Sequence, residues 1–359
     1  MKKEFLELLK ELVSFAPVSA DIDAVNRVSD RMAEFLKSRG VRVVVEDIEG
    51  RRTVYASALP DGKVSKVLFN AHVDVVPPSN PSQRIVEERD GRVYGRGVGD
   101  CLGHAVTIAQ LLCENPGKSV AAIFTTDEEI GGSTTAEMLR RGYQATEGVI
   151  VIDAWSGGDI TSCEKGMMNV RLTAHGKSGH AAYPWNSVNA LDVLVEGYHR
   201  LRQAWPVPST GGWEDTLSAT QISCDSTAFN VIPGTASMVL NIRYTTPGSE
   251  EQILERIRSL TGLDDISVDP DKACPVYVDE AHPFLQKVRE IASRVRGISV
   301  KFAKMHGATD ARHVAEICPG VPVLIDGALH GNIHAMDEWM DLANSEQLVE
   351  LYSEVIGNL

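Results

Sequence analysis

Seven residues of the kinds that bind metal ions or transfer protons stand at the ends of apolar or glycine-rich segments. Acidic side chains directly after the apolar segments AAIFTT and VIVID would be costly to bury without a counter-charge, and a divalent cation supplies one. Imidazole and carboxylate together suit zinc, with manganese or cobalt as substitutes. The residues are His72, Asp74, Asp100, Glu128, Glu129, Asp153 and His334.

No single one of these motifs is specific, because a chain with ten histidines contains His-x-Asp triplets by chance. The size of the set is more informative. An open catalytic zinc uses three protein ligands, so five ligands exceed the needs of one ion. A bridging carboxylate would let them hold two ions. The expected ligands are His72, Asp100, Glu129, Asp153 and His334, with Asp74 expected to orient a ligand.

The segments that carry these residues alternate between strand-like and helix-like patterns. Helical periodicity covers residues 2–15, 25–40, 103–113 and 133–141, and strand-like runs begin at 41, 52, 67, 119 and 148. The alternation resumes after 276 and ends in an expected helix at 345–356. This order predicts a layered α/β domain, in which sites form at the ends of strands.

Residues 168–275 follow a different order, namely strand, helix, strand, strand, helix, strand. That βαββαβ order is ferredoxin-like and describes a compact unit of about 100 residues that can fold as an insertion. We therefore predict one catalytic domain made of residues 1–167 and 276–359, interrupted by an inserted domain at 168–275.

These motifs, in this order, resemble the co-catalytic zinc peptidase family that includes acetylornithine deacetylase, succinyl-diaminopimelate desuccinylase, aminoacylase and glutamate carboxypeptidase. The resemblance spans essentially the whole chain. It implies a layered di-zinc catalytic domain with an inserted lid, which family members often use for dimerisation. It also implies the site roles: His72 and Asp153 bind the first metal, Glu129 and His334 bind the second, Asp100 bridges both, and Glu128 is the general base.

The inserted segment carries further motifs of that family. In HGKSGHAAYPWNSVNAL, His180 resembles the lid histidine that reaches the active site of the partner subunit and stabilises the oxyanion. Asn230 and Arg243 match lid positions that contact the substrate carboxylate or the tetrahedral intermediate. The segment GATDAR, which begins at Gly307, matches a glycine-rich turn near the substrate. The resemblance thus implies a homodimer formed through the lid.

The same residues suffice for amide hydrolysis on chemical grounds. Water between two zinc ions supplies hydroxide near neutral pH, and Glu128 can take its proton as the oxygen attacks an amide carbon. One metal and His180 would stabilise the oxyanion, and Glu128 would then protonate the leaving nitrogen. Arg243 suits a free carboxylate beside the scissile bond, so we expect a small N-acyl amino acid or a short peptide as substrate.

Some positions bear on the substrate. Glu164 and Lys165 stand where the desuccinylases are expected to carry arginines for a succinyl carboxylate, which argues against that substrate. Asp153, in place of a glutamate, resembles the aminopeptidase and carboxypeptidase branches. Deacylation, dipeptide cleavage and carboxypeptidase activity all stay open. Cys101, beside the expected bridging ligand, is expected to be a small buried hydrophobe.

Composition disfavours other classes of partner. The chain has 359 residues, 43% of them apolar, and a net charge of −14, which disfavours nucleic acid and anionic membranes. No apolar run has the length of a membrane span. The six cysteines form no C-x-x-C pair and are expected to be reduced thiols, as in the cytoplasm.

Two other classes of function stand as alternatives. The segment GRGVGD could be the phosphate loop of a nucleotide-dependent oxidoreductase, but its glycines give G-x-G-x-G rather than G-x-G-x-x-G. A non-catalytic metal- or ligand-binding homologue would be expected to lack the base or some ligands. This chain has all of them, which favours an enzyme.

Overall fold

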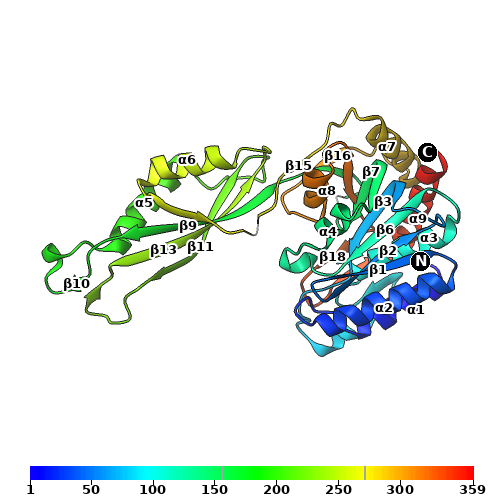
Figure 1. Ribbon diagram of the computed structural model, residues 1–359, viewed down its shortest axis with the longest axis horizontal. Coiled ribbons are helices and arrows are strands. Elements are labelled where there is room, and N and C mark those ends of the chain that lie inside the picture. Colours follow the sequence, from blue (N-terminus) through cyan, green and yellow to red (C-terminus); the bar gives the residue numbers. More distant parts are fainter. Residues whose placement is uncertain (156, 271) are drawn as a thin grey trace. The chain divides into compact units, whose positions relative to one another are not determined.

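The computed structural model describes residues 1–155, 157–270 and 272–359. The chain divides into two compact units, which Figure 1 shows with the chain coloured along its sequence. Unit 1 comprises Met1–Cys163, Tyr277–Met305 and Thr309–Leu359, and unit 2 comprises Glu164–Val276 with His306–Ala308. The predicted boundary at 168 falls inside strand β9 (Gly166–His175), and the division lies just before that strand.

Unit 1 is built on a nine-stranded sheet with the order β1-β2-β6-β3-β7-β17-β8-β15, in which β16 pairs with β8. The strands are β1 (Arg42–Ile48), β2 (Arg51–Ser57), β3 (Val64–His72), β6 (Val120–Thr125), β7 (Gln144–Ile152), β8 (Ile160–Glu164), β15 (Val276–Tyr277), β16 (Phe302–Met305) and β17 (Val323–Asp326). Strands β6, β3, β7 and β17 are parallel neighbours. Strand β6 is buried along its whole length, as expected for a strand covered on both faces.

Helices cover this sheet, and most of them share one apolar core with it. They are α1 (Lys3–Ser14), α2 (Ile22–Ser38), α3 (Leu102–Glu114), α4 (Thr134–Arg140), α7 (Pro283–Arg296), α8 (Ala311–Ile317) and α9 (Leu342–Gly357). The shared core contains residues of α1, α2, α3, α7 and α9, whereas α4 and α8 pack against each other, against β6 and against β17. Among the described residues, every helix is too short or too polar to cross a membrane.

A second, small sheet in unit 1 has the order β18-β19-β5-β4. Its strands are β4 (Glu87–Arg89), β5 (Arg92–Tyr94), β18 (His330–Gly331) and β19 (Trp339–Asp341). Strand β5 precedes the loop that carries Asp100, and β18 and β19 flank the loop that carries His334. This sheet therefore ties together two segments from opposite ends of the chain.

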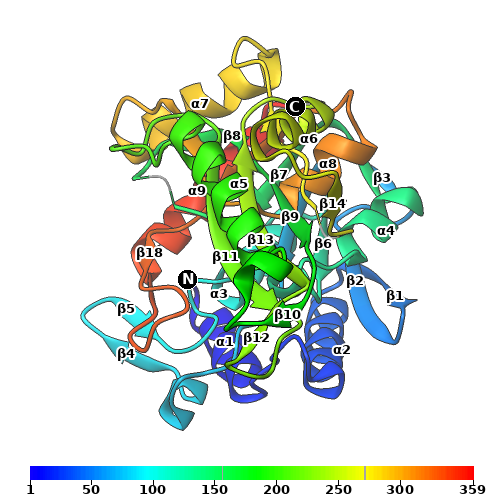
Figure 2. The same ribbon diagram turned by 90° about the vertical axis from the view of Figure 1, so that its left-hand side faces the viewer.

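Unit 2 contains a four-stranded sheet with the order β11-β13-β9-β14. Its elements are β9, α5 (Ala190–Ala204), β11 (Thr216–Cys224), β13 (Thr235–Tyr244), α6 (Glu250–Thr261) and β14 (Asp265–Val268), with a short pair β10 (Gly179–His180) and β12 (Val231–Ile232). The strand–helix–strand–strand–helix–strand order and this strand arrangement match a ferredoxin-like unit. Figure 2 shows α5 and α6, which share an apolar core with β9 and β13.

The α/β class and the long elements follow the sequence prediction, and the differences concern short elements. Strands of two or three residues, such as β4 and β18, contain too few residues to show an alternating pattern. The last helix starts at Leu342 rather than 345, because the Asp341 side chain caps it by accepting the N–H of Asn344.

Candidate functional site

Three of the predicted segments meet at one edge of the unit 1 sheet. Strand β3 lies between β6 and β7, and the three run parallel. His72 is the last residue of β3, Asp153 follows β7, and Glu128 and Glu129 lie in the short 3-10 helix η2 (Glu128–Ile130) after β6. The carboxyl ends of parallel strands face the same way, so these side chains are brought together.

The ring of His72 is held in one orientation. Its Nδ1 is 2.9 Å from the backbone oxygen of Asp74 and donates to it, which leaves Nε2 as the atom that faces the carboxylates. That Nε2 is 2.9 Å from Oδ1 of Asp100 and 3.4 Å from Oδ1 of Asp153. The ring is buried, with 1% of the side chain exposed.

His334 lies on the other side of Asp100. Its Nε2 is 3.0 Å from Oδ2 of Asp100 and 3.2 Å from both oxygens of Glu129. The residue has a φ of 63°, in the left-handed region that a side chain other than glycine adopts at a cost of roughly 1–2 kcal/mol. The surrounding loop must therefore hold it there.

Asp100 thus directs each carboxylate oxygen to a different histidine, as a carboxylate that bridges two ions does. The ligand atoms of His72, Asp100 and Glu129 lie within 4.8 Å of one another, and those of His72, Cys101 and Asp153 do so too. The donor set of imidazole nitrogens and carboxylate oxygens fits divalent zinc.

The electrostatics of the cluster favour added positive charge. Burial, followed by the charge of Asp100, raises the pKa of Glu129 to about 7. The hydrogen bond to Asp100 raises the pKa of His334 to about 9, although burial opposes it. Glu129 and His334 therefore retain protons near neutral pH that a divalent cation would displace.

Glu128 has the environment of a base. Its carboxylate is 13% exposed, and burial, followed by the charge of Asp153, raises its pKa well above the usual range. Nη1 of Arg312, in the GATDAR segment, is 3.5 Å from Glu128 Oε1. A carboxylate whose pKa is raised is a stronger base and accepts a proton more readily in catalysis.

Asp74 holds the turn that carries Glu128 and Glu129. Its fully buried carboxylate accepts the backbone N–H groups of Glu128 and Glu129 at 3.2 and 3.3 Å, and the Ser19 hydroxyl at 2.6 Å. Ser19 was not among the predicted residues, because it lies in a loop without periodicity. The sequence around Ser19 indicates only that a helix begins shortly after it, at the Asp21 cap, and does not indicate a contact with Asp74.

Cys101 is buried, as expected, and its thiol is fully engaged. The thiol donates to the backbone oxygen of Ile152 at 2.9 Å, and Nδ1 of His104 lies 3.6 Å from the sulfur. Nε2 of His104 accepts the N–H of Ala328 at 3.0 Å. These contacts give the cysteine a structural role beside the cluster.

The remaining predicted residues belong to unit 2. His180 pairs with Val231 in the β10–β12 ladder, and the N–H of Ala181 donates to the Asn230 oxygen at 2.9 Å, so His180 and Asn230 are close neighbours. Arg243 lies on β13, where its Nε donates to Asn241 at 3.2 Å. Gly307 follows His306, whose ring is 5.8 Å from that of Trp213.

Comparison of the sequence with known proteins identifies a matching family. Residues 68–358 match peptidase family M20/M25/M40. A succinyl-diaminopimelate desuccinylase of Acinetobacter baylyi is 29% identical over 318 residues, which cover 81% of this chain and 82% of the relative.

Solved structures show the same fold. The aminopeptidase PepT of Bacillus cereus has a TM-score of 0.81 at 17% identity, covering 98% of this chain and 97% of its own. A dinuclear metal-binding peptidase of the M20 family from Bacillus subtilis has a TM-score of 0.74 at 15% identity, covering 98% and 96%. The layered α/β architecture of this chain is therefore shared with these proteins.

Proposed function

Since the chain belongs to peptidase family M20/M25/M40 and is therefore a metal-dependent amide hydrolase, we propose that it cleaves an amide or peptide bond next to a free carboxylate, with Glu128 as the general base. The observation that supports this most directly is the placement of Asp100, whose two oxygens face His72 and His334 at 2.9 and 3.0 Å. Such an arrangement suits two divalent ions that share one carboxylate.

The proposed ligands divide into two sets around Asp100. His72 and Asp153 would hold the first ion, and Glu129 and His334 would hold the second. We propose zinc, because the mixed imidazole and carboxylate set suits it, with cobalt or manganese as substitutes. When bound, the two ions supply a water of lowered pKa and polarise the substrate carbonyl.

The side chains carry out the proton transfers. Glu128 takes a proton from the attacking water and returns it to the leaving nitrogen, and the contact with Arg312 fixes the direction of its carboxylate. The backbone N–H groups of Glu128 and Glu129 donate hydrogen bonds to the Asp74 carboxylate. These bonds hold the proposed base and the proposed ligand in one turn. His180 would donate to the oxyanion.

The substrate we propose is a small N-acyl amino acid or a short peptide. Burial lowers the pKa of Arg243, which nevertheless remains a cation able to bind a carboxylate in a fork. The relative named above acts on a succinyl amide, but Glu164 and Lys165 give this chain one acidic and one basic residue where arginines are expected. We therefore place deacylation of a less acidic acyl group, dipeptide cleavage and carboxypeptidase activity ahead of desuccinylation.

We also propose a homodimer formed through unit 2. Strand β11 is at the edge of its sheet, and its last seven residues are exposed. The strand has no charged residue and no proline, two of the features by which edge strands avoid pairing, although its register with β13 shifts between Ala219 and Gln221. In such a dimer His180 of the partner subunit would complete the site. All six cysteines are free thiols, which supports a reducing, cytoplasmic location.

The test is amide hydrolysis on a panel of N-acyl amino acids, dipeptides and carboxypeptidase substrates, each with its carboxyl-amidated counterpart, under added zinc, cobalt or manganese. Glu128→Gln is the matched control, because it keeps the side-chain size and the ligands. We expect metal-dependent turnover with a preference for the free carboxylate, about 10²- to 10⁴-fold lower in the variant. If no substrate of the panel is hydrolysed and the protein binds no metal, the proposal is refuted.

A further inference from the structure

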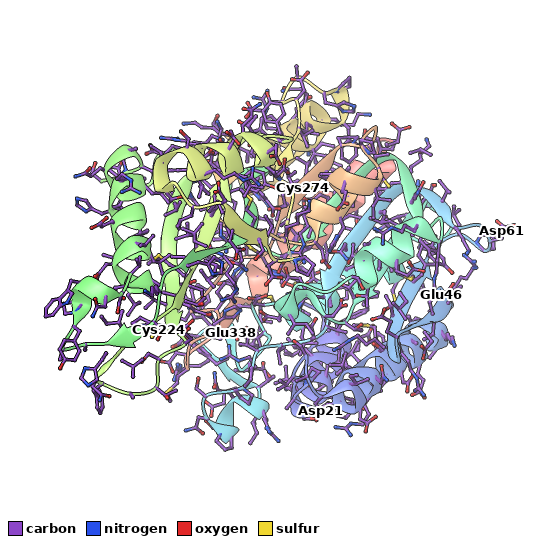
Figure 3. All side chains as sticks on the ribbon, turned by 60° about the vertical axis from the view of Figure 1, so that its left-hand side comes forward. Asp21, Glu46, Asp61, Cys224, Cys274 and Glu338 are labelled. Atoms are coloured by element: carbon purple, nitrogen blue, oxygen red, sulfur yellow. The ribbon has the colours of Figure 1, made fainter. Side chains whose placement is uncertain are left out.

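Glu338 has a fully buried carboxylate, four residues after His334 in the chain. Figure 3 labels this residue. Its Oε1 accepts the backbone N–H groups of Gly99 and Asp100 at 2.9 and 3.0 Å. Its Oε2 accepts Nη1 of Arg96 at 2.6 Å. One side chain thus fixes both the loop before Asp100 and the backbone of Asp100 itself.

The donors are arranged to compensate a buried negative charge. Burial, and to a smaller extent the charge of Asp100, raises the pKa of Glu338, and the N–H groups of Gly97 and Gly99 and the guanidinium of Arg96 offset part of that rise. Gly97 has a φ of 86°, and a Cβ there would lie 2.7 Å from Val75 and 2.9 Å from Leu102, so the loop can follow this path only with glycine at that position. The loop therefore directs the N–H groups of Gly99 and Asp100 at the Glu338 carboxylate, along a path that Gly97 makes possible.

The same contacts hold the segment of His334. Arg96 donates through Nη2 to the backbone oxygen of Ala335 at 3.4 Å, and Gln83 donates to that oxygen at 2.9 Å. The N–H of Gly95 donates to the backbone oxygen of Glu338 at 3.1 Å. His334 adopts a left-handed backbone conformation that needs such external support.

We propose that Glu338, together with Arg96, is a positioning residue that sets the spacing between Asp100 and His334 and thereby the affinity for the second metal ion. This inference rests on the proposed function, because it assumes that Asp100 and His334 are ligands. Groups that orient metal ligands without touching the ion typically change metal affinity by 10- to 100-fold when they are replaced.

The chain offers a matched control for a buried ion pair. Arg296 and Asp326 form a pair 2.7 Å apart, and its side chains are 4% and 0% exposed, the same fractions as for Arg96 and Glu338. The Asp326 carboxylate accepts from Arg296, Tyr352 and Gly327, none of which is a proposed ligand, and the contact of Asp326 with Asp153 is made by its backbone oxygen, which a side-chain substitution keeps. Asp326→Asn should therefore cost stability without altering the spacing of the two ligand segments.

The experiment compares the parent protein, Glu338→Gln, Arg96→Lys and Asp326→Asn by equilibrium dialysis against buffered free zinc. Cobalt(II) absorption in the visible region, which reports ligand geometry, is recorded on each protein, and thermal unfolding is followed in parallel. For Glu338→Gln we expect the dissociation constant of the second zinc ion, which Glu129 and His334 would hold, to rise 10- to 100-fold and the cobalt spectrum to change. Arg96→Lys keeps the positive charge but loses the two separate guanidinium donors to Glu338 and Ala335, so its dissociation constant for zinc should rise less. It replaces Glu338→Gln in the test if that variant does not fold.

Asp326→Asn should melt at a lower temperature and bind both ions as the parent does. Parental zinc constants and an unchanged cobalt spectrum in Glu338→Gln and Arg96→Lys would overturn the inference. So would an equal loss of zinc in Asp326→Asn. Failure of the proposed function itself is distinct: the parent would bind fewer than two ions, or His334→Ala would retain both.

Discussion

The backbone N–H of Glu128 donates to Oδ1 of Asp74 across 54 residues of sequence, at 3.2 Å. The other oxygen of the same carboxylate accepts the N–H of Glu129 at 3.3 Å and the hydroxyl of Ser19 at 2.6 Å. The turn that carries the proposed base and a proposed ligand is therefore attached to β3 through one buried side chain.

Asp74→Asn should lower kcat by roughly 10- to 100-fold while leaving KM nearly unchanged. The amide presents one NH₂ group toward an N–H that now lacks an acceptor, so the turn of Glu128 shifts. Steady-state kinetics with zinc counted on the purified variant provides the measurement. Ser19→Ala, which removes only a donor to the same carboxylate, should have a smaller effect, and parental kcat in Asp74→Asn would contradict the positioning role.

Removing the metal should destabilise the protein, because ions that bind only the folded site, where Asp153 lies beside His72 and Glu129 beside His334, add their binding free energy to its stability. Each ion bound at a thousandfold excess over its dissociation constant contributes about 4 kcal/mol to the free energy of unfolding. We expect the melting temperature to fall by several degrees in chelator and to return with zinc. Asp100→Asn, which weakens both sites, should respond less to chelator. A melting curve that chelator leaves unchanged in the parent would count against a bound metal.

Mixing two inactive variants tests whether the site is shared between subunits. In a mixed dimer of Glu128→Gln and His180→Ala, one of the two sites would combine an intact base with an intact His180 of the partner subunit. Random exchange makes half the dimers mixed, so activity should recover to roughly a quarter of the parental value. Each variant alone is the control. No recovery after verified subunit exchange would mean that the site does not use the partner's His180.

The stability of the fold should depend on His104 at acid pH. Burial, followed by the charge of His330, lowers the pKa of His104 to about 3. A depressed folded-state pKa means that the unfolded chain binds a proton first, so the stabilisation is present above about pH 6.5 and is lost as the pH falls toward 3. Between pH 7 and pH 4 this group alone should remove roughly 3 kcal/mol.

His104→Gln provides the comparison, because glutamine keeps an acceptor for the N–H of Ala328 and does not titrate. Urea unfolding of both proteins at several pH values gives the free energies. The parent should lose about 3 kcal/mol more than the variant over this range. Parallel curves would show that His104 does not titrate as described.

The long strands, and the meeting of His72, Glu128 and Asp153 at one sheet edge, could both be predicted from the apolar segments of the sequence. The apolar segments before His72, Glu128 and Asp153 have the composition of central parallel strands, and strands of that kind place their following residues at one edge. Glu338 and Arg96 could not be predicted in this way, because a buried ion pair has no local signal in a chain with 49 acidic residues. The order of strands in the sheet could not be predicted either, because the periodicity of a segment indicates that it is a strand but not which strands lie beside it.

The position of β17 has a consequence for how the molecule is made. This late strand lies between β7 and β8, which follow one another in the chain, and the N–H of Asp153 donates to the backbone oxygen of Asp326 at 2.9 Å. Unit 2 can close earlier, because Met167 and Ala273 exchange backbone hydrogen bonds where the chain enters and leaves it. During synthesis the sheet of unit 1 cannot close between β7 and β8 until residue 326 has emerged, and the proposed ligand His334 emerges later still, so the proposed metal site can be completed only near the end of synthesis.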